Sequence, residues 1–468
     1  MKIPKIQKNE TNSNLRKIGI EFENPVVDLK GNSIYAEDVQ EIFTDLIEKG
    51  WDGEKDKLSG NYLELNRRVN GKEVNLSTDC SWSGFEIGMP PTETIKESEE
   101  IYIIVLEEIN SSAKKFDKRY CGIGMIPGRL DSSDLSKTTK PFYKTLDYLH
   151  LHNTNLALNA NQVGVDVSLE ESVEVVNELI KVSGLVIALC ANSSISNYEI
   201  LPWRDWRVAS WQFFSITDYP KTPKLFGFPD KPFESLSDYF KRYLDISPMF
   251  IRPIRDTFVM TPKSMSWYDF LTSEKFKSRD LLGKEIEIEP GPQDINVALL
   301  NQWPYAKLHI VVDPSKINVG EFINSINENT AVDYLNDKTI SSYIEYRIAP
   351  ATPKGDEFTV SALTLGLVQN IDGLKKLTSK YNWQDWNDFL DEASLRGMSA
   401  RIQDEECPFL IKELLDIAKK GLESRYLGEE KYLEGLYNRL ESKKNPSDVN
   451  NEFISKQGPE EFLDFISY

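Results

Sequence analysis

Glutamates occur beside apolar residues in three strand-like segments of this chain. Glu21 and Glu23 lie in GIEFE, Glu86 lies in GFEIG and Glu345 lies in YIEYR. Successive side chains of a strand point to opposite faces, so the apolar neighbours can enter a core while the acids point away from it. Like charges on one face repel each other, and water or a cation must offset that repulsion. The pattern could therefore hold Mg²⁺, which takes oxygen ligands and bridges to phosphates.

Further polar residues are expected on the same faces. Gln162, Gly164 and Asp166 alternate with valines in NQVGVDV, and Arg347 follows Glu345 by two positions. If these strands lie in one sheet, they form an acidic floor with one arginine, which would stabilise charge on a transferring phosphoryl group. Two simpler interpretations remain open. The acids could be solvated, and Glu345 with Arg347 could be an ion pair of little energetic value.

The segment LPWRDWRVASWQFF, residues 201–214, contains three tryptophans and two arginines. One interpretation is a loop that covers the core, with its arginines stacked on aromatic rings. The other is a substrate contact, in which the guanidinium fork of Arg207 binds a carboxylate. The sequence leaves both interpretations open.

The composition narrows the classes of partner. The chain has 468 residues and a formal net charge of −19, which disfavours nucleic acid or an anionic membrane surface as the main partner. Its four cysteines form no CxxC pair, and no apolar run is long enough for a membrane span or a signal peptide. We therefore expect a cytoplasmic protein, with either a monomer or a homodimer possible.

Motifs of covalent catalysis are missing from the sequence. It contains no GxSxG, HExxH or CxxC, so a serine, zinc or thiol mechanism has no support. His150, His152 and His309 have no third ligand at metal spacing, and we expect surface or hydrogen-bonded roles for them.

The elements that must position the acids read as an α+β fold, because strand-like segments alternate irregularly with helical ones. An apolar stripe predicts a helix in 93–116, and Ser168 with Glu171 forms a capping box that opens another. CGIGMIPG, residues 121–128, reads as a short buried strand that ends in a turn. From about Val360 onward the pattern is helical, with no linker before this tail.

Taken together, the motifs resemble a known family. GIEFEN resembles the first strand of the plant and proteobacterial glutamate–cysteine ligases, in the glutamine-synthetase-like superfamily. Seven further segments resemble that family's motifs in the same order, over nearly the whole chain: GFEIG, CGIGMIP, NQVGVD, ALCANSS, RVASW, YIEYRIA and IAKKGLES. The resemblance implies a curved antiparallel sheet with the active site on its concave face, backed by helices. We expect a catalytic domain in 1–375 and a helical region in 376–468 packed on the same unit.

The resemblance also implies an ATP-dependent reaction. ATP would phosphorylate a small-molecule carboxylate, and an amine would then attack the acyl phosphate to form an amide. The implied Mg²⁺ ligands are Glu21, Glu23, Glu86 and Glu345. Arg347 and Gln162 would contact the nucleotide, with Arg347 at the transferring phosphate. The implied substrate contacts are Arg207, which would bind the carboxylate, together with Trp211, Asn192 and Trp82.

The chain departs from the family at several of these places. Gly164 replaces an asparagine that joins the metal shell, Trp82 enters a glycine-rich stretch, and Val208–Ala209 replaces a pair that contains a histidine. About three dozen residues, from Ala306 to Ser342, stand where the family has a few. We therefore expect that the residues that bind ATP are largely retained and that those around the substrates differ from the family's. A phosphotransferase on the same scaffold and a catalytically degenerate nucleotide-binding homologue are the alternatives.

Overall fold

A large antiparallel sheet forms the centre of the molecule. The structure is a computed structural model that describes residues 15–56, 59–79, 81–131, 157–213, 227–248, 250–254, 257–260, 265–280, 284–300 and 303–468. Within these residues the sheet has nine strands in the order β14-β15-β7-β1-β5-β4-β3-β2, and β6 also pairs with β1. The strands are β1 (Ile18–Asp28), β2 (Asp52–Lys55), β3 (Tyr62–Val69), β4 (Lys72–Thr78), β5 (Gly84–Gly88), β6 (Lys118–Tyr120), β7 (Asn161–Asp166), β14 (Ala306–Val312) and β15 (Thr339–Tyr346).

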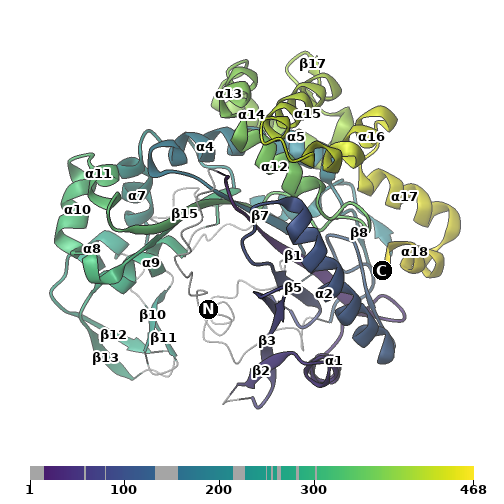
Figure 1. Ribbon diagram of the computed structural model, residues 1–468, viewed down its shortest axis with the longest axis horizontal. Helices are drawn as coiled ribbons and strands as arrows, with labels where there is room; N and C mark the ends of the chain where they lie inside the picture. Colours follow the sequence, from purple (N-terminus) through teal and green to yellow (C-terminus); the bar gives the residue numbers. More distant parts are fainter. Residues whose placement is uncertain are drawn as a thin grey trace.

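Helices cover one face of this sheet. The strands follow an arc in Figure 1, and α4, α12 and α2 lie on its outer side. On that side α12 packs against β7, and α4 packs against β14 and β15. Helix α2 supplies Tyr102, whose ring lies 4.3 Å from that of Phe22 on β1. The expected α+β architecture, an antiparallel sheet backed by helices, is confirmed.

The helices are numerous and mostly short. They are α1 (Ala36–Glu48), α2 (Ile95–Lys115), α4 (Leu169–Lys181), α5 (Ser183–Cys190), α6 (Trp206–Phe213), α7 (Leu236–Leu244), α8 (Trp267–Leu271), α9 (Pro292–Leu300), α10 (Val319–Asn327), α11 (Ala331–Leu335), α12 (Thr359–Gln369), α13 (Ile371–Thr378), α14 (Trp383–Arg396), α15 (Cys407–Glu423), α16 (Glu434–Ser442), α17 (Pro446–Gln457) and α18 (Pro459–Ile466). Among the described residues, no helix combines the length and the apolar character needed to cross a membrane. The predicted capping box at Ser168 and Glu171 is present at the start of α4.

Burial follows the alternation of side chains along β1. Ile18, Ile20 and Phe22 are at most 2% exposed and enter the main core under the helices. Gly19 and Glu21 alternate with them and are partly exposed on the opposite face. A shift of one residue in the register would bury the acids in that core, so the apolar set fixes which face carries the carboxylates.

One local prediction was wrong. CGIGMIPG is not a strand, because β6 ends at Tyr120 and the segment makes only isolated bridges. Its glycines allow close backbone approach, since a Cβ at Gly124 would lie 2.6 Å from the Pro350 Cβ. In the tryptophan-rich segment, for which the sequence left two interpretations open, Trp206–Phe213 forms helix α6.

The stretch between Ala306 and Ser342 is ordered structure that extends the sheet. It contains strand β14, which pairs with β15, and helices α10 and α11. A separate four-stranded sheet precedes it and consists of β10 (Phe250–Ile254), β11 (Thr257–Met260), β12 (Phe276–Asp280) and β13 (Glu285–Ile288). The long stretch thus adds a strand directly beside Glu345.

A buried ion pair within the helical tail is hydrogen-bonded to the start of helix α2. The Arg425 Nε and Glu429 Oε2 atoms lie 2.7 Å apart, and their side chains are 1% and 2% exposed. Glu429 also accepts a 2.9 Å hydrogen bond from the backbone N–H of Ile95, at the start of α2. Arg425 donates to the carbonyl of Glu93 at 2.7 Å. The division at residue 375 stays a prediction, but these bonds tie the tail to the earlier part of the chain.

We predict that Glu429→Gln lowers the free energy of unfolding by about 3 kcal/mol, because it leaves the Arg425 charge buried without its counter-ion. The matched control is Glu423→Gln, which removes an ion pair with Lys419 between side chains about half exposed. That change should cost at most about 0.5 kcal/mol. Urea denaturation measures both variants, and equal losses would contradict the account.

Candidate active site

Strand register brings the four predicted metal ligands and Gln162 to one face of the sheet. The four segments are neighbouring strands, in the order β15-β7-β1-β5. Glu23 lies opposite Glu86 on β5, and Glu21 lies opposite Gln162 on β7. Residues directly opposite in antiparallel strands share a face of the sheet. We call the face with Glu21, Glu23, Glu86, Gln162 and Glu345 the polar floor.

Two glutamates of the polar floor are held in surroundings that disfavour their charge. Burial, and then the negative charges of Glu86, Glu345 and Glu23, raise the pKa of Glu21 well above its ordinary value. Burial, and then Asp79 and Glu86, raise the pKa of Glu23 to about 8, although Arg207 and Arg347 act in the opposite direction. Closely spaced buried acids of this kind need a cation to ionise together.

Gln162 orients Glu23. The backbone N–H of Ala160 donates to Glu23 Oε2 at 2.7 Å, and the Gln162 side-chain amide donates to Glu23 Oε1. Gln162 is 4% exposed, and its Oε1 accepts no hydrogen bond within the described residues. A buried oxygen without a donor is costly unless a ligand, a water or an ion supplies one. This atom therefore favours a bound group at the floor.

Glu345 has different surroundings from Glu21 and Glu23. Its Oε1 lies 2.9 Å from Arg347 Nη1, and its Oε2 lies 2.7 Å from His309 Nε2. Burial alone would raise the pKa of Glu345, but Arg347, His309 and Lys307 together hold it below its ordinary value. Glu345 is thus ionised and already paired with the Arg347 cation and the His309 imidazole. The ion pair between Glu345 and Arg347 left open by the sequence is present.

Strand β14 contributes two residues that the sequence analysis missed at this site. Lys307 lies opposite Glu345, and His309 lies opposite Tyr343 with its ring stacked on that of Tyr343 at 4.7 Å. Burial, against the opposing charge of Glu345, lowers the pKa of Lys307 to about 8. AKLHIVV alternates polar and apolar residues as GIEFE does, and this alternation was the available signal.

Glycines leave the middle of the polar floor without side chains. Gly19 lies opposite Gly164, which in turn lies opposite Glu345. A Cβ at Gly19 would meet nothing within 4 Å, and one at Gly164 would lie 3.4 Å from the Tyr343 ring. Glycine within a strand often marks a place where a ligand approaches the backbone. The same glycine supplies no side-chain ligand for a metal.

Arg207 approaches the floor from α6. It is 5% exposed, and its Nη1 donates to the carbonyl of Ile348 at 3.0 Å. Burial lowers its pKa, whereas the charges of Glu23 and Asp205 oppose that shift. The negative charges of Glu23 and Asp205 thus act on Arg207, and its carboxylate-binding role stays a prediction.

The contacts of the other three predicted substrate residues, Asn192, Trp82 and Trp211, do not place them on the polar floor. Asn192 is fully buried and donates to the carbonyls of Gly122 and Ala351 at 3.1 and 2.7 Å. It also accepts a 2.8 Å hydrogen bond from Asn450, so its contacts are those of a residue that joins backbone segments. Trp82 is 5% exposed and belongs to the main core. Trp211 lies on α6 and is partly exposed.

The donor set fits Mg²⁺ without forming a complete cage. Within the described residues, no three His, Cys, Asp or Glu side chains are arranged so that they could hold a metal ion by themselves. Mg²⁺ characteristically binds through one or two carboxylates, several waters and substrate phosphates. Glu21, Glu23 and Glu86 offer such carboxylates, and the unpartnered oxygen of Gln162 adds an acceptor.

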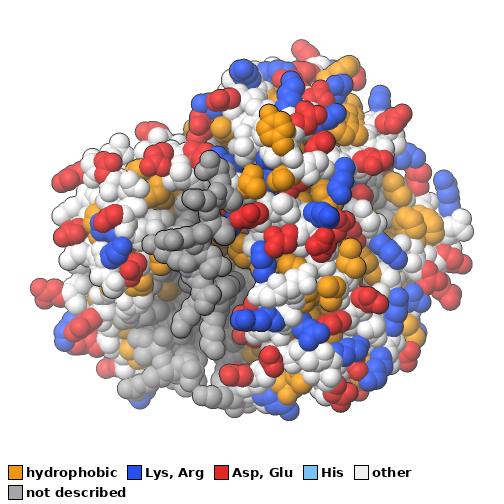
Figure 2. All heavy atoms as spheres, viewed as in Figure 1, with side chains coloured by type: hydrophobic (Ala, Val, Ile, Leu, Met, Phe, Trp, Pro, Cys, Tyr) orange, Lys and Arg blue, Asp and Glu red, His pale blue; other side chains and the backbone are white. Residues whose placement is uncertain are grey.

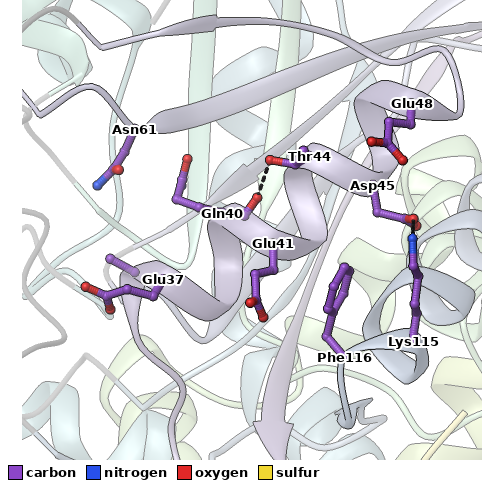
Figure 3. Close-up of a pocket in the computed structure, with 10 residues that line it drawn as sticks. Glu37, Gln40, Glu41, Thr44, Asp45, Glu48, Asn61, Lys115 and Phe116 are labelled. Carbon is purple, nitrogen blue, oxygen red and sulfur yellow. Dashed lines mark hydrogen bonds and ion pairs between the residues drawn. The ribbon is translucent and has the colours of Figure 1, made fainter.

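A surface pocket lies away from this face. It runs along α1, where Glu37, Glu41 and Glu48 project, and Lys115 pairs with Asp45 at 2.5 Å beside it (Figure 3). No residue of the polar floor lines it. On the face shown in Figure 2, acidic and basic side chains are mixed over the described surface, without a broad basic patch for nucleic acid.

The comparisons with known proteins agree with this geometry. A model of the family described as glutamate-cysteine ligase family 2 (GCS2) matches residues 17–451. The chain belongs to glutamate-cysteine ligase family 2. A comparison with curated proteins gave no match.

Solved structures show the fold of this family. The chain is similar to glutamate–cysteine ligase from Francisella tularensis, solved in complex with AMP, with a TM-score of 0.55, 10% identity, and coverage of 97% of this chain and 87% of that one. It is also similar to a bifunctional glutathione synthetase from Pasteurella multocida, with a TM-score of 0.51, 10% identity, and coverage of 97% and 51%. The chain thus spans about half of the Pasteurella protein. At this identity the likeness establishes the GCS2 fold.

We predict that Glu21→Gln stabilises the protein in the absence of metal and nucleotide, on the order of 1 kcal/mol at neutral pH. The folded pKa of Glu21 is raised, so ionisation of this carboxyl opposes folding as pH rises above its ordinary value. The gain should shrink in acid, where the carboxyl is neutral in both states. Urea denaturation at neutral and acidic pH measures it.

Glu345→Gln is the control for that experiment. It should destabilise the same protein by about 2 kcal/mol, because Arg347 and His309 lose a charged partner. A loss of stability in Glu21→Gln at neutral pH would contradict the electrostatic description of the floor.

Proposed function

We propose that this GCS2 family member is an ATP- and Mg²⁺-dependent carboxylate–amine ligase. The observation that carries the proposal is the register of β1 and β5, which sets Glu23 opposite Glu86 with Glu21 on the same face. Their shared negative charge and the raised pKa of Glu23 favour a divalent cation there. The AMP bound to the similar Francisella enzyme supports an adenine nucleotide as the partner of that cation.

Each side chain of the polar floor has a proposed role. Mg²⁺ bound through one or two carboxylates among Glu21, Glu23 and Glu86, with water and substrate phosphate as its other ligands, would neutralise phosphate charge. Gln162 would hold Glu23 in place. Arg347 would contact the transferring phosphate from its position beside Glu345. Arg207 would bind the substrate carboxylate, with Trp211 as an adjacent contact. Trp82 and Asn192 would then shape the site from behind, because both are buried.

The proposed reaction needs no nucleophile from the enzyme. A carboxylate oxygen of the first substrate attacks the γ-phosphorus of ATP, and ADP leaves. The amine nitrogen of the second substrate then attacks the carbonyl carbon of the acyl phosphate. Phosphate leaves with the former carboxylate oxygen, and the nitrogen releases a proton to solvent. Arg207 and Arg347 would hold the two anions at reacting distance and offset their repulsion. Small-molecule substrates follow from the family, while their identity and the expected cytoplasmic location stay predictions.

We predict that isotopically labelled oxygen in the substrate carboxylate appears in the released phosphate. Screening ATP turnover against amino acids and amines identifies a substrate pair, and mass spectrometry of the phosphate follows the label. ADP release that needs only one co-substrate, with phosphate retained on it, would instead support a phosphotransferase. Nucleotide binding without any turnover across the panel would support a degenerate homologue.

We predict that Glu86→Gln lowers ADP release by about 100-fold, because one carboxylate of the cation site is lost. Raised Mg²⁺ should recover part of the rate, since the defect is in cation affinity. The matched control is Glu37→Gln on the outer surface, which should leave turnover unchanged. Unchanged turnover in Glu86→Gln would contradict the assignment of the cation site.

A further inference from the structure

We propose that the ammonium group of Lys307 takes the place of a metal ion beside Glu345, so that Glu345 binds no Mg²⁺ directly. The inference rests on the proposed function, because it concerns how the same floor holds ATP. It divides the four glutamates into two groups. Glu21, Glu23 and Glu86 would hold Mg²⁺, and Glu345 would hold cationic side chains of the protein itself.

The first argument is the occupancy of Glu345. Each of its oxygens already lies close to a nitrogen of another side chain, Arg347 Nη1 at 2.9 Å and His309 Nε2 at 2.7 Å. A Mg²⁺ ion demands near-octahedral geometry at about 2.0–2.1 Å. It would have to enter beside two partners and against the positive charges of Arg347 and Lys307. Those positive charges would repel the ion, and a single carboxylate would have to offset them.

The second argument is the position of Lys307. It lies directly opposite Glu345 in the register of β14 and β15, and it is only 4% exposed. The charges that act on it are those of Glu345, Arg347 and Glu21. Its Nζ also lies 6.0 Å from the centre of the Trp303 ring. The ammonium group is therefore held over the floor and away from bulk water.

The third argument is that glycines occupy the polar floor on the other side of Glu345. Gly164 lies opposite Glu345 there and Gly19 follows on β1, so neither neighbour offers a side-chain oxygen to a metal. A Cβ at Gly19 would meet nothing within 4 Å, which leaves room for an anion close to the backbone. An ammonium group is a compact point charge that binds phosphate well. The surroundings of Glu345 thus suit a phosphate held by Lys307 better than a second cation site.

The opposite end of the floor behaves differently. There Glu23 lies opposite Glu86 and Glu21 shares their face, and closely spaced carboxylates favour a divalent cation. One face therefore has an acidic end that favours a metal ion and a cationic end that favours phosphate.

The test compares Lys307→Met, which removes the charge, with Lys307→Arg, which keeps it. The first readout is the affinity for a non-hydrolysable ATP analogue in EDTA, and the second is the number of Mn²⁺ ions bound at saturating analogue. We expect Lys307→Met to bind the analogue at least about tenfold more weakly in EDTA. In excess Mn²⁺ it should recover affinity and bind one more ion than the wild type. Lys307→Arg should resemble the wild type in both.

A control variant and the contrary outcomes complete the test. Lys181→Met removes the ion pair with Glu178 on α4 and should change neither readout. Unchanged affinity of Lys307→Met in EDTA, or an unchanged Mn²⁺ count, would overturn the inference while leaving the proposed function intact. Failure of the wild type to bind the analogue even with Mn²⁺ would overturn both. Circular dichroism of each variant confirms that it is folded.

Discussion

Repulsion among carboxylates that share one face of a sheet is the constraint on which this structure depends. The apolar residues that alternate with the acids along β1, such as Ile20 and Phe22, are no more than 2% exposed, and their burial fixes the register of β1. That register forces Glu23 against Glu86 and Glu21 toward both of them. The apolar core thus stabilises an arrangement that electrostatics opposes, and a bound cation would relieve the cost.

Cationic side chains of the protein offset the negative charge of the polar floor more at one end than at the other. At the β14 and β15 end, Arg347, His309 and Lys307 surround Glu345 and lower its pKa. At the β1 and β5 end, Arg207 and Arg347 oppose the rise in the pKa of Glu23 but do not cancel it. One end of the polar floor is therefore acidic and the other end carries positive charge. Such an arrangement suits a ligand with charges of both signs, such as a metal–nucleotide complex with a cationic metal and anionic phosphates. Gly19 and Gly164 lie between the two ends.

The alternation of residues predicted much of this arrangement. In GIEFE, GFEIG and YIEYR the apolar partners identify the buried face, so the acids could be assigned to one side before the sheet was known. The contribution of β14 could not be predicted with the same ease, because Lys307 and His309 pair with Glu345 and Tyr343 only through a non-local register. The strand predicted at 121–128 is absent for a non-local reason. Its Gly124 lies against Pro350, a contact that no local pattern encodes.

The most direct test of the central claim is to locate the metal in a crystal of the protein grown with Mn²⁺ and a non-hydrolysable ATP analogue. The anomalous signal of manganese marks the ion independently of any assumption about function. The account predicts a peak in contact with carboxylate oxygens of Glu21, Glu23 or Glu86, with the analogue's phosphates on its other side. A manganese peak remote from the polar floor, or an analogue bound on another face of the molecule, would contradict it.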